Sequence, residues 1–281
     1  MDFILPLLFL TSNSIFYSIT FKKNIAETIP FTIIISCIII YIFGIFNTLT
    51  VGYYFLIFLS IIFSFYIISK IKKLEEIKYL FINNELYIFF ILYTLVYILD
   101  LNRGLNAYDE ISHWGPMVKE IFTTGQIYHS KEIFIFRHRD YPPIFQIWES
   151  FWCFICLGYK ESYLYKALHT ACLSIFLPII KNNSKKTILY YILITISIIS
   201  VCNIIPLEDG NFGSTIYLDA PLALISTYCN FIILKNIEFN KFNILKLILS
   251  LSFLLLIKQI AILFYLINIA ILIITFFLKE N

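Results

Sequence analysis

Long runs of apolar residues recur along the whole 281-residue chain, separated by short polar segments. A helix needs about 20 consecutive apolar residues to cross the hydrocarbon core of a bilayer. The last two runs are divided only by Lys258 and Gln259, which predicts a tight helical hairpin turned at Lys258. The runs lie at roughly 3 to 20, 30 to 48, 51 to 69, 84 to 100, 162 to 180, 187 to 206, 216 to 234, 243 to 257 and 260 to 278.

The composition excludes a water-soluble fold. Hydrophobic residues make up 60% of the chain and charged residues only 14%, whereas soluble domains are about half apolar and a quarter charged. We therefore predict an all-α protein, a polytopic transmembrane helical bundle of about 9–10 spans. Residues 1–83 are expected to form N-terminal transmembrane helices, and residues 84–281 a transmembrane core with a polar outer loop at 101–141. The net charge of +3 is too small to indicate a nucleic-acid partner.

Lysine clusters predict the orientation of the bundle, because short cytoplasmic loops are enriched in basic residues. Residues 142–158 would place one of these clusters on the wrong face if they crossed the bilayer, so we expect a juxtamembrane or re-entrant helix there. Loop 101–141, the acidic segment 207–219 and Lys258 then all lie at the outer face. The clusters are Lys22 to Lys23, Lys70 to Lys78, Lys181 to Lys186 and Lys235 to Lys241.

The outer loop gathers ionisable residues that are costly to place at the edge of a bilayer, and such residues usually mark a functional site. Its two motifs are YDEISHW and RHRDYPP. The alternative is that the acidic pair caps a surface helix and that Asp140 pairs with an arginine in a solvated ion cluster. The candidate residues in the loop are Asp109, Glu110, His113, Arg137, Arg139, Asp140 and Tyr141.

A short amphipathic helix is predicted inside this loop. Pro116 suits a first helical turn, and Gly125 suits a left-handed C-terminal cap. Asp109 and Glu110 stand just before the helix, at the end where partial positive charge stabilises a carboxylate or a phosphate. We expect this helix to lie along the membrane surface.

The order of the motifs resembles the GT-C class of integral-membrane glycosyltransferases, which use lipid-phosphate sugars. YDEISHW is similar to the acidic motif of their first large outer loop, and RDYPPIFQ to the Pro-Pro motif where that loop re-enters the membrane. YLDAPLAL resembles their later Asp-Pro-type segment, and LLLIKQIAIL resembles their leucine-rich helix followed by lysine. The most similar branch is a bacterial one, related to the dolichyl-phosphate-mannose mannosyltransferase and lipid A aminoarabinose-transferase families. Three spans precede the loop where many relatives have one, and the chain stops at Asn281, which suggests a shortened enzyme.

The resemblance implies transfer of a sugar from a polyprenyl-phosphate donor to an acceptor at the outer face of the cell inner (cytoplasmic) membrane. Asp109 is expected to act as the base, with Glu110 beside it. Arg137, Arg139 and Lys258 would stabilise the leaving phosphate. An Asp-Glu-His set is a poor metal signature, so no metal site is predicted and any cofactor stays unknown. The other expected substrate-binding residues are His113, Asp140, Tyr141 and Asp219.

Two other functions stay open at this point. A transporter or lipid-carrier translocase would also place charges inside a membrane protein, although the chain has no internal repeat. A non-catalytic membrane subunit is the third interpretation. Lys166 and His169 fall inside a predicted span and receive no role, whereas Trp114, Trp148 and Trp152 are expected to anchor the chain at the outer interface.

Overall fold

The computed structural model describes residues 2–70, 84–127, 141–181, 215–235 and 240–280, together with residues 188, 191, 192, 195 and 196. Within these residues the regular structure is entirely helical, so the predicted all-α class is correct for them. The predicted run at 187–206 lies almost wholly outside the described residues. The first helices are α1 (Ile4–Phe21), α2 (Ile25–Ile45), α3 (Leu49–Lys70) and α5 (Asn84–Leu99).

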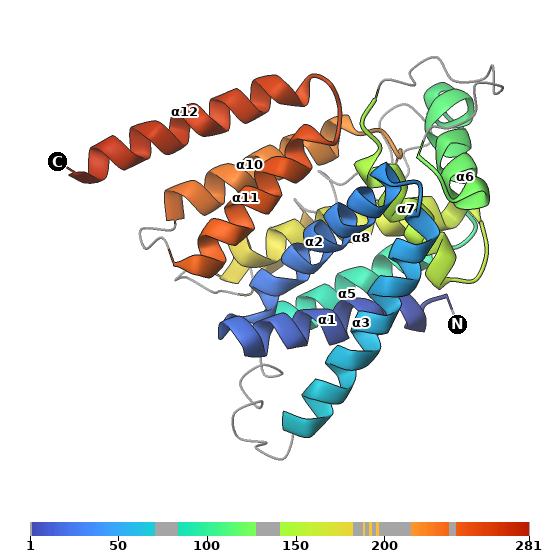
Figure 1. Cartoon of the computed structure of the whole chain (residues 1–281), viewed down its shortest axis with the longest axis horizontal. Helices are drawn as coiled ribbons and strands as arrows, with labels where there is room; N and C mark the ends of the chain where they lie inside the picture. Colours follow the sequence, from blue (N-terminus) through green and yellow to red (C-terminus); the bar gives the residue numbers. More distant parts are fainter. Residues whose placement is uncertain are drawn as a thin grey trace.

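The helices pack side by side as a bundle, with a shorter group across one of its ends (Figure 1). Helix α8 packs against α2, α5 and α10, which places it in the middle of the bundle. The helices after α5 are the π-helical turn η1 (Glu110–Trp114), α6 (Gly115–Thr124), α7 (Ile144–Ile155), α8 (Glu161–Lys181), α10 (Asp219–Lys235), α11 (Lys241–Leu255) and α12 (Ala261–Glu280).

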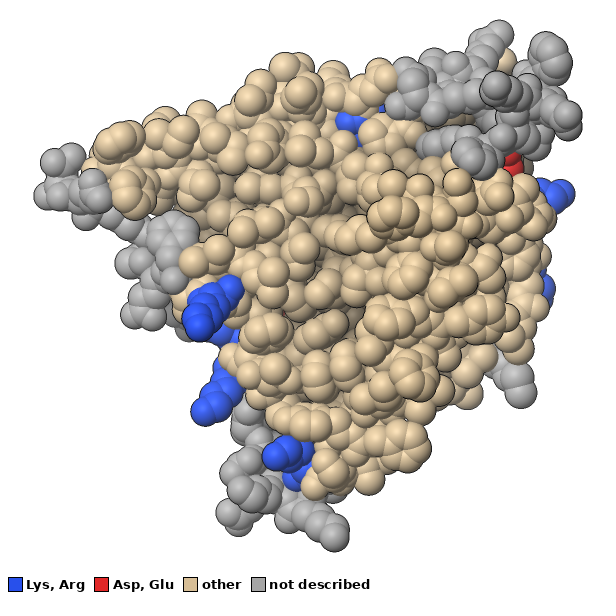
Figure 2. All heavy atoms as spheres, in the orientation of Figure 1, with Lys and Arg blue, Asp and Glu red and all other residues tan. Residues whose placement is uncertain are grey.

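Four of these helices are long and apolar enough to cross a membrane. Large apolar side chains on them point outward, among them Phe65 at 68% exposure and Phe277 at 61%. Figure 2 shows a broad face of uncharged side chains, with Lys and Arg groups gathered mainly near its edges. Water-soluble proteins rarely expose apolar surface on this scale, so the chain is a membrane protein. The four helical segments are Ile4–Phe21, Ile25–Ile45, Leu49–Lys70 and Ala261–Leu278.

The two ends of the bundle differ in charge. The Phe21 ring packs on Phe242 at 4.8 Å, so the end of α1 lies beside the start of α11. Lys22, Lys23 and Lys241 therefore gather at one end, called here the lysine end. The turn between α11 and α12 lies at the opposite end, called here the pocket end, which is the end nearest α6 in Figure 1.

Both ends of α7 lie at the pocket end. The backbone N–H of Ile144 donates to the carbonyl of Leu256, after α11, at 3.2 Å. At the other end of α7, the Cys156 thiol lies 3.6 Å from the carbonyl of Asp2, just before α1. A helix of 12 residues tied at both ends in this way does not run the length of the bundle.

Two predicted local features are confirmed. The helical hairpin turns at Lys258, between α11 and α12. Helix α6 has Pro116 in its first turn and ends at Gly125, which has a φ of 66°. One detail differs, because the turn η1 continues into α6 and draws Glu110 into helical structure instead of leaving it before the helix.

The predicted interfacial role of the tryptophans is wrong for the residues in α7. Trp148 and Trp152 are both fully buried, and the Trp148 indole donates to the carbonyl of Ala167 in α8 at 3.0 Å. All ten residues from Ile144 to Cys153 are buried, so α7 is enclosed by its neighbours. The sequence shows the amphipathic rings but not that other helices cover them.

Candidate functional site

A small polar pocket opens at the pocket end of the bundle. Its volume is about 120 Å³, and the residues that line it come from four separate stretches of the chain. The first stretch leads through η1. The others are Tyr141, three residues before α7, the start of α10 and the α11–α12 turn. The lining residues are Tyr108, Asp109, Ser112, His113, Trp114, Tyr141, Tyr217, Asp219 and Lys258.

The two adjacent acidic residues of the loop point in different directions. Asp109 is exposed and lines the pocket, whereas Glu110 is fully buried beneath it. Successive residues of a helical turn are about 100° apart, which explains how neighbours in sequence face solvent and interior respectively. A π-helical turn such as η1 is rare in proteins and occurs often at functional sites.

Glu110 joins three parts of the pocket end through its carboxylate. One oxygen accepts the backbone N–H groups of Asn106 (3.2 Å) and Ala107 (3.1 Å) and the hydroxyl of Tyr165 in α8 (2.8 Å). The other oxygen accepts the backbone N–H of Ile216 at 2.9 Å. The bond to Ala107 is the glutamate half of a capping box. With four donors and no exposure, Glu110 is placed to hold the pocket together and not to touch a ligand in the pocket.

Lys258 and Asp219 form an ion pair inside the pocket. The Lys258 Nζ lies 2.8 Å from the Asp219 Oδ1, and their side chains are 22% and 70% exposed. The same ammonium lies 5.9 Å from the centre of the Tyr141 ring. Since the lysine is partly exposed and its partner is well solvated, an anion in the pocket has access to the ammonium group.

Aromatic rings form one wall of the pocket. Tyr141 stacks on Trp114 with the ring centres 5.7 Å apart and an angle of 18°, and the His113 ring meets Tyr141 edge-on at 5.7 Å. Burial raises the pKa of the Tyr217 hydroxyl, and the negative charge of Asp109 raises this pKa further. A hydrogen bond from the backbone of Asp109 partly opposes the rise. Tyr217 therefore stays a neutral phenol at neutral pH.

The structure brings together most of the residues that the sequence singled out. Five of them line the pocket, and Glu110 lies beneath it. The predicted phosphate ligands Arg137 and Arg139 and the neighbouring Asp140 lie outside the described residues. The five are Asp109, His113, Tyr141, Asp219 and Lys258.

Sequence reasoning missed four lining residues. Tyr108 and Ser112 flank residues that were predicted, and Tyr217 precedes Asp219 by two positions, so proximity in sequence was the available signal. Trp114 was assigned to interfacial anchoring, but it is 4% exposed and belongs to the aromatic wall.

A second ionic cluster lies between α5 and α8. The Asp100 carboxylate contacts His169 Nδ1 at 2.7 Å and the Arg103 guanidinium at 3.1 Å. That guanidinium lies 4.2 Å from the centre of the Tyr165 ring, whose hydroxyl donates to Glu110. Tyr165 and Arg103 thus connect the Glu110 carboxylate to the ion pairs of Asp100.

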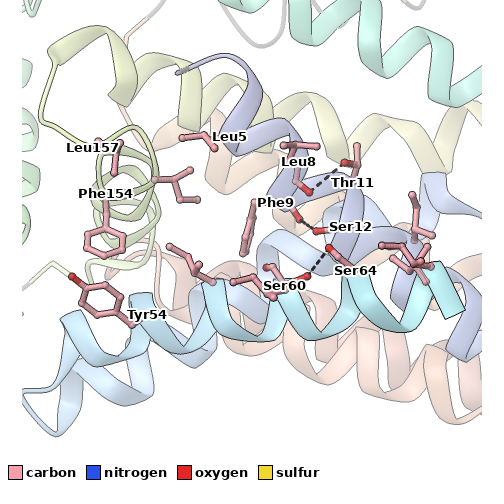
Figure 3. Close-up of a pocket in the computed structure, with 16 residues that line it drawn as sticks. Leu5, Leu8, Phe9, Thr11, Ser12, Tyr54, Ser60, Ser64, Phe154 and Leu157 are labelled. Atoms are coloured by element: carbon pink, nitrogen blue, oxygen red, sulfur yellow. Dashed lines mark hydrogen bonds between the residues drawn. The ribbon is translucent and has the colours of Figure 1, made fainter.

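A much larger hollow lies elsewhere, between α1, α3 and the end of α7 (Figure 3). It measures about 680 Å³ and is lined by apolar and hydroxyl side chains. The hydroxyls of Thr11, Ser12 and Ser64 donate to backbone carbonyls of their own helices, so they offer no donor to a ligand. None of the described residues that line this groove is charged, so they offer none of the ionic chemistry of the pocket.

Comparison with known proteins finds no matching family model, curated protein or solved structure. Within the described parts of the chain, no set of three or more His, Cys, Asp or Glu side chains is arranged to hold a metal ion.

Proposed function

We propose that this chain is a membrane glycosyltransferase that moves a sugar from a polyprenyl-phosphate donor to an acceptor. The observation that carries the proposal is that Asp109 and Lys258, far apart in sequence, line one pocket at one end of an apolar bundle. A carboxylate next to a cation suits a reaction in which a hydroxyl loses a proton while a phosphate leaves.

The proposed reaction assigns one task to each group. The acceptor hydroxyl attacks the anomeric carbon, and its proton passes to the carboxylate of Asp109. The bond between the anomeric carbon and the phosphate oxygen breaks, and polyprenyl phosphate leaves. Its negative charge is stabilised by Lys258, which Asp219 holds in place at 2.8 Å. Glu110 acts as a positioning residue, because its carboxylate is buried and already bonded to four donors.

The proposal includes an orientation in the membrane. The lysine end faces the cytoplasm, in accordance with the positive-inside rule, and the pocket end faces outward. The chain then has about 9–10 spans in the cell inner membrane, with α7 re-entering from the outer side. A lipid-linked donor would reach the pocket from the outer leaflet.

A transporter is the second candidate, and the cluster of Asp100, Arg103 and His169 favours it. Buried ionisable residues within a membrane bundle often belong to a proton or ion pathway. Solute movement into liposomes that needs no polyprenyl-phosphate sugar would support transport and count against the transferase.

The transferase proposal is tested with purified protein in liposomes and a panel of radiolabelled polyprenyl-phosphate hexoses and pentoses. With water as the acceptor, hydrolysis of at least one donor to free sugar and polyprenyl phosphate is expected for the wild type, with a loss on the order of 100-fold or more in Asp109→Asn. Glu120→Gln is the matched control, because Glu120 lies on α6 and does not line the pocket. Equal release by wild type and Asp109→Asn would contradict the proposal.

A further inference from the structure

Glu149 lies in α7, which its neighbours enclose, and has no role in the reaction proposed above. Its side chain is fully buried in α7, which packs against α1, α2, α6 and α8. Neither carboxyl oxygen has a hydrogen-bond partner in the described structure. Gln146, one turn earlier on the same helix, is also fully buried, and neither of its amide atoms has such a partner.

An ionised carboxylate is very unfavourable in this place. A buried charge without a hydrogen bond or counter-ion costs far more free energy than a buried neutral acid. Glu110 shows the contrast, because its equally buried carboxylate accepts four hydrogen bonds. The two residues therefore differ in how well each can carry a negative charge.

The groups around Glu149 add to this difference. Those that act on it electrostatically are Glu110 and the Cys172 thiol of α8, and its own charge in turn affects Cys153 and Tyr159. None of these four groups is a cation. Burial raises the pKa of the Glu149 carboxyl well above its ordinary value, and the negative charge of Glu110 raises it further. A buried carboxyl group that no donor or cation compensates keeps its proton.

We propose that Glu149 is an interior proton-binding site, occupied at neutral pH, and that loss of its proton loosens the Glu110 contacts that hold the pocket. Deprotonation would place a second negative charge beside Glu110. Glu110 accepts hydrogen bonds from Ile216 and from the turn before η1, which lie on the two sides of the pocket. Repulsion between the two carboxylates would therefore weaken the hydrogen bonds on both sides. The inference concerns the protein's interior and does not depend on the proposed transferase.

The first test detects the proton itself. Infrared spectra of the protein in lipid at pH 7 are expected to contain the carbonyl stretching band of a protonated carboxylic acid. The band should be lost in Glu149→Gln, which keeps the size of the side chain, and kept in the control Glu120→Gln. A band unchanged in Glu149→Gln, or no band in the wild type, would overturn the proposal.

The second test measures the coupling to Glu110. In Glu110→Gln the band of Glu149 should titrate at a lower pH, by about one unit or more, because the neighbouring charge is gone. Hydrogen exchange of the Ile216 amide gives an independent readout. At a pH where the wild type has lost the band, its Ile216 amide should exchange on the order of tenfold faster than the same amide in Glu149→Gln. At low pH, where Glu149 holds its proton, the two proteins should show equal exchange rates. Equal rates at every pH would show that the site and the pocket are not coupled.

Discussion

The carboxylate of Glu110 accepts the backbone N–H of Ile216 at 2.9 Å, and this bond joins the turn η1 to the segment that leads into α10. The same residue also bonds to the turn before η1 and to Tyr165. One buried side chain thereby fixes the positions of Asp109 on one side and Asp219 on the other.

Replacing Glu110 by Ala should destabilise the protein strongly. The change removes this acceptor from the buried N–H of Ile216 and the buried hydroxyl of Tyr165, and also from the part-buried N–H groups of Asn106 and Ala107. Each unsatisfied buried group costs about 1–3 kcal/mol. A loss of about 3 kcal/mol or more is expected in thermal unfolding in detergent. Glu110→Gln keeps one acceptor oxygen and should lose less. An unfolding free energy of Glu110→Ala within about 0.5 kcal/mol of the wild type would contradict the assigned role.

Replacing Lys258 by Gln should leave stability nearly unchanged. Its ion pair with Asp219 is largely solvated, and such pairs contribute about 0–1 kcal/mol. The substitution is therefore expected to remove the cation of the pocket from a folded protein. A large fall in unfolding temperature would show that Lys258 has a structural role instead.

Replacing Asp100 by Ala should be far more costly than the change at Lys258. Asp100 is fully buried between His169 and Arg103, and removing one partner of a buried ion pair costs about 3–5 kcal/mol. Denaturant unfolding of the two variants, side by side, tests the contrast. Similar losses in both would argue against a tightly packed interior cluster.

Gly125 should not tolerate a side chain. Its φ is 66°, and an added Cβ would clash with the Thr50 Oγ1, so Gly125→Ala should cost more than about 1 kcal/mol. Gly158 is the matched control, because a Cβ there meets nothing within 4 Å. Gly158→Ala should leave the unfolding temperature close to that of the wild type. Equal effects of the two substitutions would mean that the α6 cap is wrongly described.

Stability should fall as pH rises, because the pKa of Glu149 is raised in the folded protein. Below the unfolded-state pKa of about 4.3, both states hold the proton and the folded state carries no penalty. Above it the unfolded state ionises first, so stability is lost at up to about 1.4 kcal/mol per pH unit until the folded-state pKa is passed.

Thermal unfolding across this pH range measures the slope. Glu149→Gln has no titratable group at this position, so its unfolding free energy should depend less on pH, whereas Glu120→Gln should behave as the wild type. Identical slopes in Glu149→Gln and the wild type would show that Glu149 does not titrate between the two states.

Periodicity in the sequence was sufficient to predict the long helices. Apolar runs at roughly 3 to 20 and 260 to 278 correspond to α1 (Ile4–Phe21) and α12 (Ala261–Glu280), because the bilayer requires a long apolar segment whatever its neighbours are. The turn at Lys258 was predictable for the same reason, since a charged residue interrupts a run too long for one crossing.

The candidate site was predictable only in outline. The motifs indicated that Asp109, Asp219 and Lys258 would meet, and all three line the pocket. The difference between Asp109 and Glu110 was not predictable, because it depends on which side of a helical turn faces α8. Likewise His169 received no role from sequence, since its partner Asp100 lies far away in the chain, just after α5.

The most direct measurement is the binding of a polyprenyl phosphate to the purified protein, compared with the matching polyprenol that lacks the phosphate. The wild type should prefer the phosphate, and Lys258→Gln should lose about tenfold or more of this preference, equivalent to about 1.4 kcal/mol. Lys160→Gln, which changes an exposed lysine outside the pocket, should bind as the wild type does. Equal affinity of the wild type for both lipids, or an unchanged preference in Lys258→Gln, would contradict a pocket that binds lipid phosphate.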